Sequence, residues 1–347
     1  MPTVKDVASK ANVSPGTVSN VLTGKRPVAL TTRERVLRVI EELGYQPNIL
    51  ARSLINRRSE TIAVVASGLE YFGPSQAVTG IEREADSSGY SVILELVPWL
   101  DSKQAKRALS MLAGRQVDGI IWAVPEISNN RDWVRDEDLS RLPPIVFLSM
   151  EPRPGLTVVT AGNREGAYMA TVHLLEQGRR RVALISGPAD WWEVRERTKG
   201  WGDALGEAGL PCDESMFVTG DWYASSGEFG LQTLLERHPS IDAVVAGNDQ
   251  MALGVLRAAR LAGRRVPDDL AVVGFDNIPE SAYFWPPLTT VDQHLRDVGS
   301  AAVRLLNQLI DARLTGEPAP EPGAATLRPE LIVRESSNNT APVGDLA

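Results

Sequence analysis

Cysteine and histidine are scarce in this sequence of 347 residues, and their scarcity excludes several kinds of site. Cys212 is the only cysteine, so the chain forms no internal disulfide and no thiolate metal cluster. His173, His238 and His294 never stand four residues apart, the spacing at which a helix presents two of them to one metal ion. We therefore expect neither a metal site nor a cofactor.

Long apolar runs are also missing from the sequence. No stretch approaches the ~18 apolar residues of a transmembrane helix, and Met1–Asp6 lacks the basic-then-apolar order of a secretory signal. Apolar residues make up 43% and charged residues 23%, which is ordinary for a folded soluble protein. The sequence predicts a cytoplasmic protein without a membrane partner, of two to three domains at roughly 150 residues each.

Motifs of the common enzyme classes are absent as well. The sequence holds no phosphate loop with Gly-Lys-Ser/Thr, no Gly-x-Gly-x-x-Gly after a strand, no Gly-x-Ser-x-Gly elbow and no His-Glu-x-x-His. Together these absences argue against an enzyme.

Charge is distributed unevenly along the chain. Residues 1–58 carry ten Lys/Arg and four Asp/Glu, a net charge of +6, whereas the remainder carries 26 basic and 40 acidic residues, a net charge of −14. The overall net charge of −8 conceals this contrast. A small basic head on a large acidic body indicates that the head meets a polyanion such as nucleic acid. A solvated charged face is the alternative.

The first 45 residues are patterned as three short helices. Residues that favour helix ends delimit them: the caps Thr3, Ser14 and Thr31 or Thr32, Pro15 at the first position of the second helix, and the stops Gly24 and Gly44. The second helix is expected to run from Gly16 to about Leu22. A helix, a tight turn and a second helix of about eight residues is helix-turn-helix spacing. An ordinary small helical bundle is the alternative.

A further short helix is indicated after Pro47. Asn48 is a good cap for the segment that ends at Asn56, before the basic pair Arg57-Arg58. So short a helix is marginal in water. We therefore expect it to become ordered only when something binds it.

From residue 61 onward, short β-branched runs alternate with amphipathic helical stretches. The expected strands are Ile62–Ala66, Ser91–Leu96, Gly119–Val124, Ile145–Ser149, Val182–Ser186, Ala243–Ala246, Ala271–Phe275 and Leu331–Arg334. The expected helices lie near 75–88, 101–114, 163–177, 191–208, 225–237, 248–262 and 294–313. This alternation is typical of an α/β fold with parallel sheets covered on both faces. The length favours two lobes, with ligands at the carboxyl ends of the strands.

Several motifs occur in a fixed order along the chain. The head contains Val4-Lys5-Asp6-Val7-Ala8, Val13-Ser14-Pro15-Gly16-Thr17-Val18-Ser19, Gly44-Tyr45-x-Pro47-Asn48 and Ala51-Arg52-Ser53-Leu54. The body contains Asn248-Asp249-Gln250-Met251-Ala252-Leu253-Gly254, Val273-Gly274-Phe275-Asp276 and Pro287-Leu288-Thr289-Thr290-Val291. Over about residues 2–335 the chain resembles the lactose-repressor (LacI/GalR) family of transcriptional regulators.

The resemblance implies a helix-turn-helix headpiece at 1–46, a hinge helix and linker at 47–60, and a core at 61–335 similar to periplasmic sugar-binding proteins. One lobe of this core comprises about 61–160 and 292–320, and the other about 161–290 and 321–335. The chain then crosses between lobes near Thr160, Val291 and Pro320. The polar tail at 336–347 is expected to be flexible, and because it lacks a leucine heptad we expect a homodimer and no tetramer.

The resemblance also implies that the chain binds a pseudo-palindromic double-stranded DNA operator. The second helix enters the major groove with its base-facing positions Pro15, Gly16 and Asn20, of which only Asn20 can pair with adenine. Phosphate contacts are expected from Thr3, Ser14, Thr17 and Ser19. The hinge candidates are Asn48, Ala51 and Leu54, and Leu54 is expected to insert into the central base step of the minor groove.

For the core, the resemblance implies a small effector held between the lobes. The expected contacts are Ser67, Tyr71, Phe72, Pro74, Ser149, Trp191, Arg197, Trp222, Asn248, Asp276 and Gln293. Arg197 and Asp276 supply paired donors and acceptors for vicinal hydroxyls, and Trp222 offers a flat apolar face to a sugar ring. These features favour a repressor that answers to a sugar or glycoside. Asn248 and Asp276 can also serve as helix caps.

Two positions depart from the family's sugar-binding members. Ser149 stands where they often place an acidic residue, and Leu295 where some place an aromatic. Trp122, Trp191 and Trp192 could add stacking surface, so a larger or less polar glycoside is left open.

Other functions stay open at this point. A regulator of the same fold could answer to a purine or to a phosphorylated protein partner, and a sugar-binding protein could use the head only for oligomerisation. Asp190, Glu193 and Arg195 stand near Arg197 and are consistent with surface charge.

Overall fold

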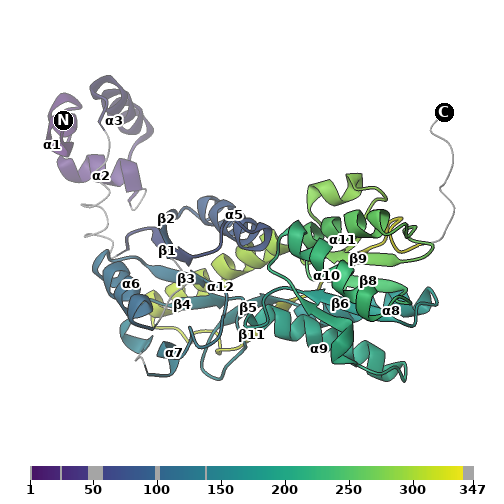
Figure 1. The fold of residues 1–347 in the computed structure, drawn as a ribbon. Helices are drawn as coiled ribbons and strands as arrows, with labels where there is room; N and C mark the ends of the chain where they lie inside the picture. The colour runs from purple at the N-terminus through teal and green to yellow at the C-terminus, as the bar shows by residue number, and fades with distance from the viewer. Residues whose placement is uncertain (1, 24–25, 46–57, 98–101, 137–138, 339–347) are drawn as a thin grey trace, which may run out of the picture. The chain divides into compact units, whose positions relative to one another are not determined.

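The computed structural model of the chain describes residues 2–23, 26–45, 58–97, 102–136 and 139–338 (Figure 1). It divides into two compact units, Met1–Ser59 and Glu60–Ala347, and each is described by itself. Among the described residues, no helix is long and apolar enough to cross a membrane. In the same part of the chain, no group of three or more His, Cys, Asp or Glu side chains is arranged to hold a metal ion.

The first unit is a head of three helices, α1 (Val4–Lys10), α2 (Pro15–Thr23) and α3 (Leu30–Leu43). Thr3 and Asp6 form a capping box at the start of α1. The Ser14 hydroxyl accepts a hydrogen bond from Thr17 N at 3.1 Å, and Gly44 ends α3 with a φ of 60°. Small apolar side chains form the core between the helices: Val7, Ala8, Ala11, Val18, Val21, Val36 and Val39. The three predicted helices and the caps at Thr3 and Ser14 are confirmed.

The start of α3 differs from the prediction. Helical backbone begins at Leu30, with Ala29 as the flanking residue and without a side-chain cap. Thr31 and Thr32 therefore lie inside the first turn, where neither can cap it. Gly24 and the expected hinge helix, with its candidates Asn48, Ala51 and Leu54, lie outside the described residues.

The first lobe of the second unit is a parallel sheet in the order β11-β5-β4-β3-β1-β2. Its strands are β1 (Thr61–Ala66), β2 (Ser91–Leu96), β3 (Gly119–Ala123), β4 (Ile145–Leu148), β5 (Val158–Ala161) and β11 (Ala324–Leu327). Helices α5 (Phe72–Ser87) and α12 (Leu295–Thr315) cover one face, and α6 (Ser102–Gly114) and α7 (Trp133–Asp136) cover the other (Figure 1). Alternate residues of β1 serve the two faces: Ile62 and Val64 pack toward α5, Ala63 and Val65 toward α6.

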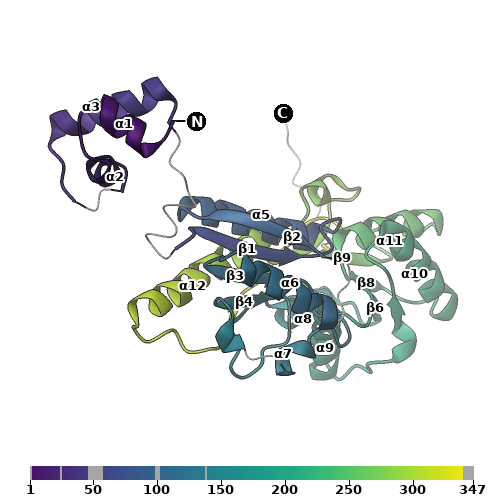
Figure 2. The same ribbon diagram turned by 90° about the vertical axis from the view of Figure 1, so that its left-hand side faces the viewer.

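The second lobe is built in the same way around a sheet in the order β12-β10-β9-β8-β6-β7. Its strands are β6 (Val182–Ser186), β7 (Phe217–Thr219), β8 (Ala243–Ala246), β9 (Ala271–Phe275), β10 (Thr289–Asp292) and β12 (Glu330–Ile332). Helices α8 (Asn163–Glu176) and α9 (Trp192–Glu207) cover one face, and α10 (Ala224–Arg237) and α11 (Asp249–Leu261) cover the other (Figure 2). Single 3-10 turns occupy Leu139–Arg141, Glu214–Met216 and Pro279–Tyr283.

Each strand and helix predicted for the core is present, with ends that differ by at most three residues. The structure adds four strands that the sequence patterns do not predict, β5, β7, β10 and β11, each three or four residues long. It also shows that β12 runs antiparallel to β10, as an edge strand on an otherwise parallel sheet.

The third crossing between the lobes lies later in the chain than predicted. Ala324 pairs with Val158, so β11 extends the first sheet and the chain reaches the second lobe only between Leu327 and Glu330. The boundary near Pro320 is therefore wrong, because a short edge strand follows it in the first lobe. The other two crossings follow β5 and β10.

The beginning of the C-terminal tail is fixed, contrary to the prediction that flexibility starts at residue 336. Ser336 and Ser337 are buried. The Ser336 hydroxyl donates to Val272 O at 2.6 Å and accepts from Thr289 N at 2.8 Å, and that of Ser337 bonds to the Thr289 hydroxyl at 2.7 Å. Polar residues are held here because they satisfy backbone groups of β9 and β10.

Candidate ligand-binding and DNA-binding sites

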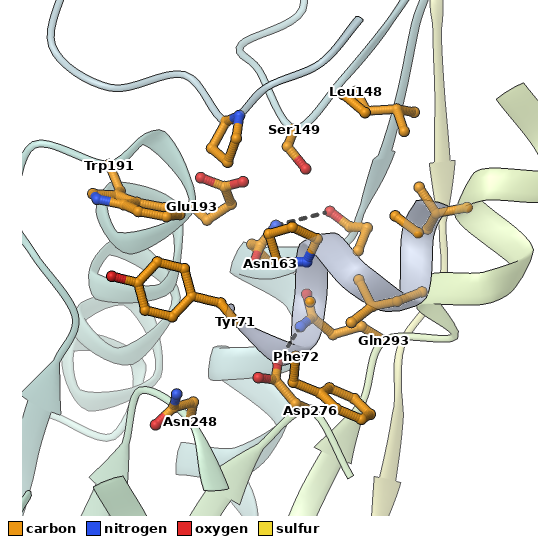
Figure 3. Close-up of a pocket in the computed structure, with 18 of the residues that line it drawn as sticks. Tyr71, Phe72, Leu148, Ser149, Asn163, Trp191, Glu193, Asn248, Asp276 and Gln293 are labelled. Atoms are coloured by element: carbon orange, nitrogen blue, oxygen red, sulfur yellow. Dashed lines mark hydrogen bonds between the residues drawn. The ribbon is translucent and has the colours of Figure 1, made fainter. Parts of the chain in front are cut away.

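A cavity lies between the two lobes, where the strands of both sheets end (Figure 3). Because parallel strands share one carboxyl edge, the residues that follow them are brought together there. The predicted effector contacts that line the cavity are Tyr71, Phe72, Pro74, Ser149, Trp191, Arg197, Trp222, Asn248, Asp276 and Gln293. Ser67 is the exception.

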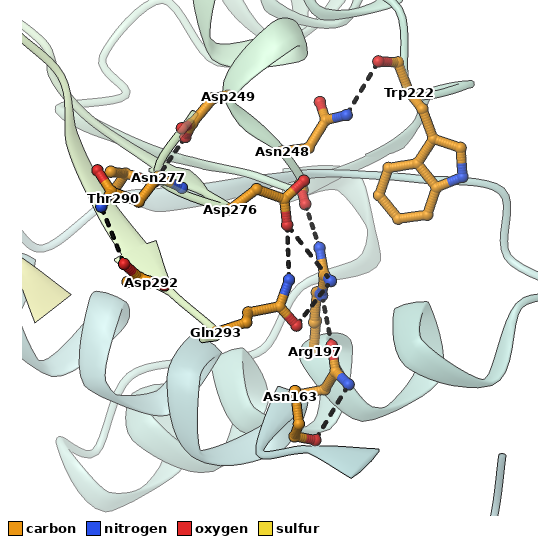
Figure 4. A network of polar contacts seen from close by, with 12 residues as sticks. Asn163, Arg197, Trp222, Asn248, Asp249, Asp276, Asn277, Thr290, Asp292 and Gln293 are labelled. Atoms are coloured by element: carbon orange, nitrogen blue, oxygen red, sulfur yellow. Dashed lines mark hydrogen bonds and ion pairs between the residues drawn. The ribbon is translucent and has the colours of Figure 1, made fainter. Parts of the chain in front are cut away.

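Arg197 is the centre of a buried polar network (Figure 4). Its Nε donates to Asn163 Oδ1 at 2.8 Å, its Nη1 to Gly247 O, and its Nη2 to Gln293 Oε1 at 3.4 Å. Gln293 in turn donates to Asp276 Oδ1 at 2.6 Å, and that oxygen lies 4.0 Å from Arg197 Nη2. The guanidinium also stacks on Phe275, 3.9 Å from the ring centroid. The network therefore presents fixed donors and acceptors side by side.

Aromatic rings form a wall of the same cavity. Trp191 and Trp222 meet edge to face with centroids 5.5 Å apart, and Tyr71 meets Trp191 edge to face at 5.9 Å. Tyr71 follows β1 of the first lobe and Trp191 precedes α9 of the second, so this contact spans the cleft. A Cβ at Gly187 would come within 2.3 Å of the Trp222 ring, so a glycine is required there.

Asn248 has a structural task as well as a place on the cavity wall. Its Oδ1 caps α11 by accepting from Met251 N at 2.8 Å, and its Nδ2 donates to Trp222 O at 3.0 Å. The cap predicted as an alternative is thus present. Trp222 itself has a φ of 75°, in the left-handed region that side chains rarely adopt. Asn248 helps to hold the ring in this strained position.

Three carboxylates in and behind the cavity are buried, and burial shifts their titration. It raises the pKa of Asp276 to about 6 and that of Glu193 to about 7. Asp249 lies just behind the wall, where it accepts hydrogen bonds from Thr290 Oγ1 and Ile278 N, and burial raises its pKa to about 8. Burial lowers the pKa of Arg197, and the negative charges of Asp276 and Glu193 partly oppose this shift by raising it.

Comparisons with known proteins agree on one family over almost the whole chain. Residues 3–48 match the description "Bacterial regulatory proteins, lacI family", and residues 171–337 match a periplasmic binding protein-like domain. The regulator CelR of Thermobifida fusca is 38% identical over 344 residues, which cover 96% of this chain and 98% of CelR. The chain belongs to the LacI family. It is a DNA-binding transcriptional regulator with a ligand-binding domain, and not an enzyme.

Other members of the LacI family match the chain over a similar length. The transcriptional repressor PurR of Aliivibrio salmonicida is 33% identical over 338 residues, 97% of this chain and 99% of PurR. A CelR–cellobiose complex superposes with a TM-score of 0.70 at 35% identity, covering 97% of this chain and all of that one. A lac repressor dimer bound to operator and the anti-inducer ONPF superposes with a TM-score of 0.85 at 32% identity, covering 97% of this chain and 99% of that one.

Three sequence predictions about the cavity are corrected by the structure. Ser67 is buried after β1 and does not line the cavity, because the chain turns at Gly68 and presents Tyr71 instead. Trp122 is fully buried against Trp133, with centroids 4.9 Å apart, on the α6 side of the first sheet. Trp192 lines a separate hollow and not this cavity. Neither tryptophan adds stacking surface to the cavity.

Two polar residues of the cavity were not predicted from the sequence. Glu193 is buried and lines it, and is not surface charge. Its position four residues before Arg197 on α9 places both on one helix face, a signal that was available. Asn163 bonds Arg197 from the start of α8, directly after β5, a strand that the sequence pattern does not predict.

In the headpiece, the predicted DNA contacts gather at the start of α2. Ser14, Pro15 and Gly16 are exposed, and Thr17, Ser19 and Asn20 are half-buried. The hydroxyls of Ser14 and Thr17 also bond one another at 2.9 Å. Thr3 is exposed at the start of α1. These positions leave a helix N-terminus accessible, which suits phosphate contacts in a DNA-binding regulator.

Proposed function

We propose that the chain is a transcriptional repressor whose operator affinity changes when a sugar or glycoside enters the cavity between its lobes. The observation that carries this proposal is the Arg197–Gln293–Asp276 network, which offers a carboxylate and a guanidinium to adjacent hydroxyl groups. The Trp222 ring beside it supplies the apolar face that the C–H side of a sugar ring requires. A relative solved with cellobiose supports the same class of ligand.

The proposed mechanism is a change in how far the lobes close. A ligand that touches Tyr71 and Phe72 of the first lobe and Arg197 and Asp276 of the second favours the closed form. Closure then alters the spacing of two headpieces and the order of the hinge helices. A coupling of about 1–3 kcal/mol between the two sites suffices.

For DNA, we propose a homodimer on a pseudo-palindromic operator, acting in the bacterial cytoplasm where the chromosome lies. The start of α2 enters the major groove with Asn20 at an adenine, and Leu54 wedges into the central step of the minor groove. The similarity to an operator-bound lac repressor dimer supports this arrangement. Exposed apolar side chains on the core, among them Tyr283 and Trp285, provide surface for a second copy.

The hinge proposal has its own test. Leu54→Ala should weaken binding to the specific operator far more than binding to unrelated DNA, because only the specific complex contains the kinked step. Equal losses on both DNAs would count against insertion.

A thermal-shift screen of the purified protein tests the ligand class. We expect one or more mono- or disaccharides to raise the melting temperature by mass action, and Asp276→Ala and Arg197→Ala to abolish the rise. Purines belong in the same screen because PurR is a relative and the aromatic wall would also stack on a purine. A rise with hypoxanthine or guanine and with no sugar would overturn the sugar proposal and leave the DNA-binding regulator standing.

A further inference from the structure

Glu193 is a charged side chain of the cavity that the Arg197 network does not use. It lies on α9, lines the cavity and is 9% exposed. Its Oε2 has no hydrogen-bond partner among the described residues. A buried carboxylate oxygen without a donor is costly, and it is retained where something else supplies the donor. The cavity is the place from which a donor can come.

Glu193 marks an end of the cavity that is distinct from the Asp276 end. Figure 3 shows Glu193, Ser149 and Trp191 together at one end, and Asp276 with Asn248 at the other. Burial raises the pKa of Glu193, and the Ser149 hydroxyl beside it opposes that rise. Ser149 follows β4 of the first lobe with a φ of 51°, which turns it out of the strand direction.

The chemistry of this end matches that of the Asp276 end. It has a carboxylate acceptor, a hydroxyl that can donate or accept, and a neighbouring aromatic ring, Trp191. Among the described residues no ion pair joins Arg197 to Glu193, although their charges interact, and the guanidinium bonds instead to Asn163, Gly247 and Gln293. The two ends therefore form two separate sets of sugar-binding groups in one cavity.

We propose that Glu193 and Ser149 form a second subsite, which binds hydroxyl groups of a second ring while Arg197 and Asp276 hold the first. The effector class is then a disaccharide or a glycoside with a hydroxylated second ring. This inference rests on the proposed sugar function and narrows it. Because Glu193 and Ser149 belong to different lobes, a second ring also ties the lobes together in the closed form.

Isothermal titration calorimetry on the full chain tests the subsite. The probes are cellobiose, lactose and maltose, each compared with glucose, galactose and methyl β-D-glucopyranoside, with weak ligands measured by competition. The variant is Glu193→Gln, which keeps the shape and removes the charge, and it is measured at pH 8 because burial raises the pKa of Glu193 to about 7. Glu196→Gln is the matched control, because Glu196 is on the same helix but does not line the cavity. Its Oε1 pairs instead with Lys199 Nζ, at a distance of 2.6 Å.

We expect Glu193→Gln to weaken the disaccharide at least about tenfold, the effect of losing a hydrogen bond to a charged group, and to change the monosaccharide less than about twofold. Glu196→Gln should change neither. Ser149→Ala, which removes the partner from the other lobe, should show the same selectivity with a smaller loss. It also serves as the test if Glu193→Gln does not fold.

Other results separate the two proposals. The second subsite is refuted if the variants lower the disaccharide and monosaccharide affinities equally, or change neither of them. It is also refuted if only monosaccharides bind. In each of these cases the sugar function stands. If the wild-type chain binds none of these sugars, the sugar function fails and the subsite fails with it.

Discussion

The two lobes contribute different chemistry to the cavity that they share. Its charged side chains, Glu193, Arg197 and Asp276, all come from the second lobe. The first lobe contributes a mostly apolar surface: Tyr71, Phe72, Pro74, Ala77, Ala123, Pro125 and Leu148. The comparison suggests a division of labour, in which the second lobe recognises polar groups of the ligand and the first closes over the ring faces.

Direct contacts already join the lobes beside the cavity. Trp192 N donates to Glu126 O and Ser128 N donates to Asp190 O, both at 2.9 Å, and Ile127 forms a β-bridge with Trp191. The loop after β3 is thus attached to the start of α9. Together with the Tyr71–Trp191 contact, these bonds hold the two lobes against one another beside the cavity.

The largest effect is expected from removing a charged side chain that the second lobe contributes to the cavity. Asp276→Asn removes the carboxylate that lies 4.0 Å from Arg197 Nη2, and with it the ion pair of the buried guanidinium. Sugar affinity should fall by roughly 100-fold or more, since truncating a buried charged pair costs about 3 kcal/mol. Calorimetry with the sugar found in the thermal screen measures it. An affinity within threefold of wild type would show that the second lobe does not recognise the ligand through Asp276.

A smaller effect is expected from removing an aromatic ring that the first lobe contributes to the cavity. Tyr71→Ala removes a ring that meets Trp191 and Tyr223, each at 5.9 Å. Aromatic pairs are worth about 0.5–1.5 kcal/mol each, so the affinity should fall about tenfold. Tyr71→Phe keeps the ring and should lie within about threefold of wild type. If Tyr71→Phe lost as much as Tyr71→Ala, the hydroxyl and not the ring would be the important group.

The last effect concerns how the stability of the folded core depends on pH. Burial raises the pKa of Asp249 in the second lobe from an ordinary value of 3.8 to about 8. Between these values the folded core holds a proton that the unfolded chain has released, so the free energy of unfolding falls as pH rises, by about 1.4 kcal/mol per pH unit. Asp249→Asn stays neutral, so its slope between pH 5 and 7 should be shallower.

Urea unfolding of the wild-type chain and the Asp249→Asn variant at pH 5, 6 and 7 measures this slope. The asparagine can still accept from Ile278 N and can donate to Thr290 Oγ1, which keeps both hydrogen bonds. Identical slopes for the two proteins would mean that Asp249 is ionised in the folded state.

The same contrast explains which parts of the site the sequence could predict. Asn248 and Asp276 stand in motifs just after the predicted strands β8 and β9, so their meeting at one edge could be foreseen. Asn163 could not be, since it depends on β5, a four-residue strand whose place in the sheet is set by β4 and β11. Glu193 was missed because charge near a helix start is usually solvated, and only the opposite lobe buries it.

In the fold as well, features set by neighbouring residues could be predicted, and features set by distant residues could not. Capping residues and apolar periodicity locate the helices to within three residues, because both act over a few neighbouring positions. The third crossing and the buried Ser336 and Ser337 depend on partners far away in the chain. Local patterns contain no information about such partners.

Operator binding with and without ligand tests the central claim most directly. A DNA site selected by the protein from a random pool is labelled, and its affinity for the wild-type chain is measured by fluorescence anisotropy with and without a saturating amount of the sugar that raises the melting temperature. We predict a change of about 5- to 150-fold, the range of a 1–3 kcal/mol coupling, which Asp276→Asn abolishes. An unchanged operator affinity at saturating sugar would contradict the account.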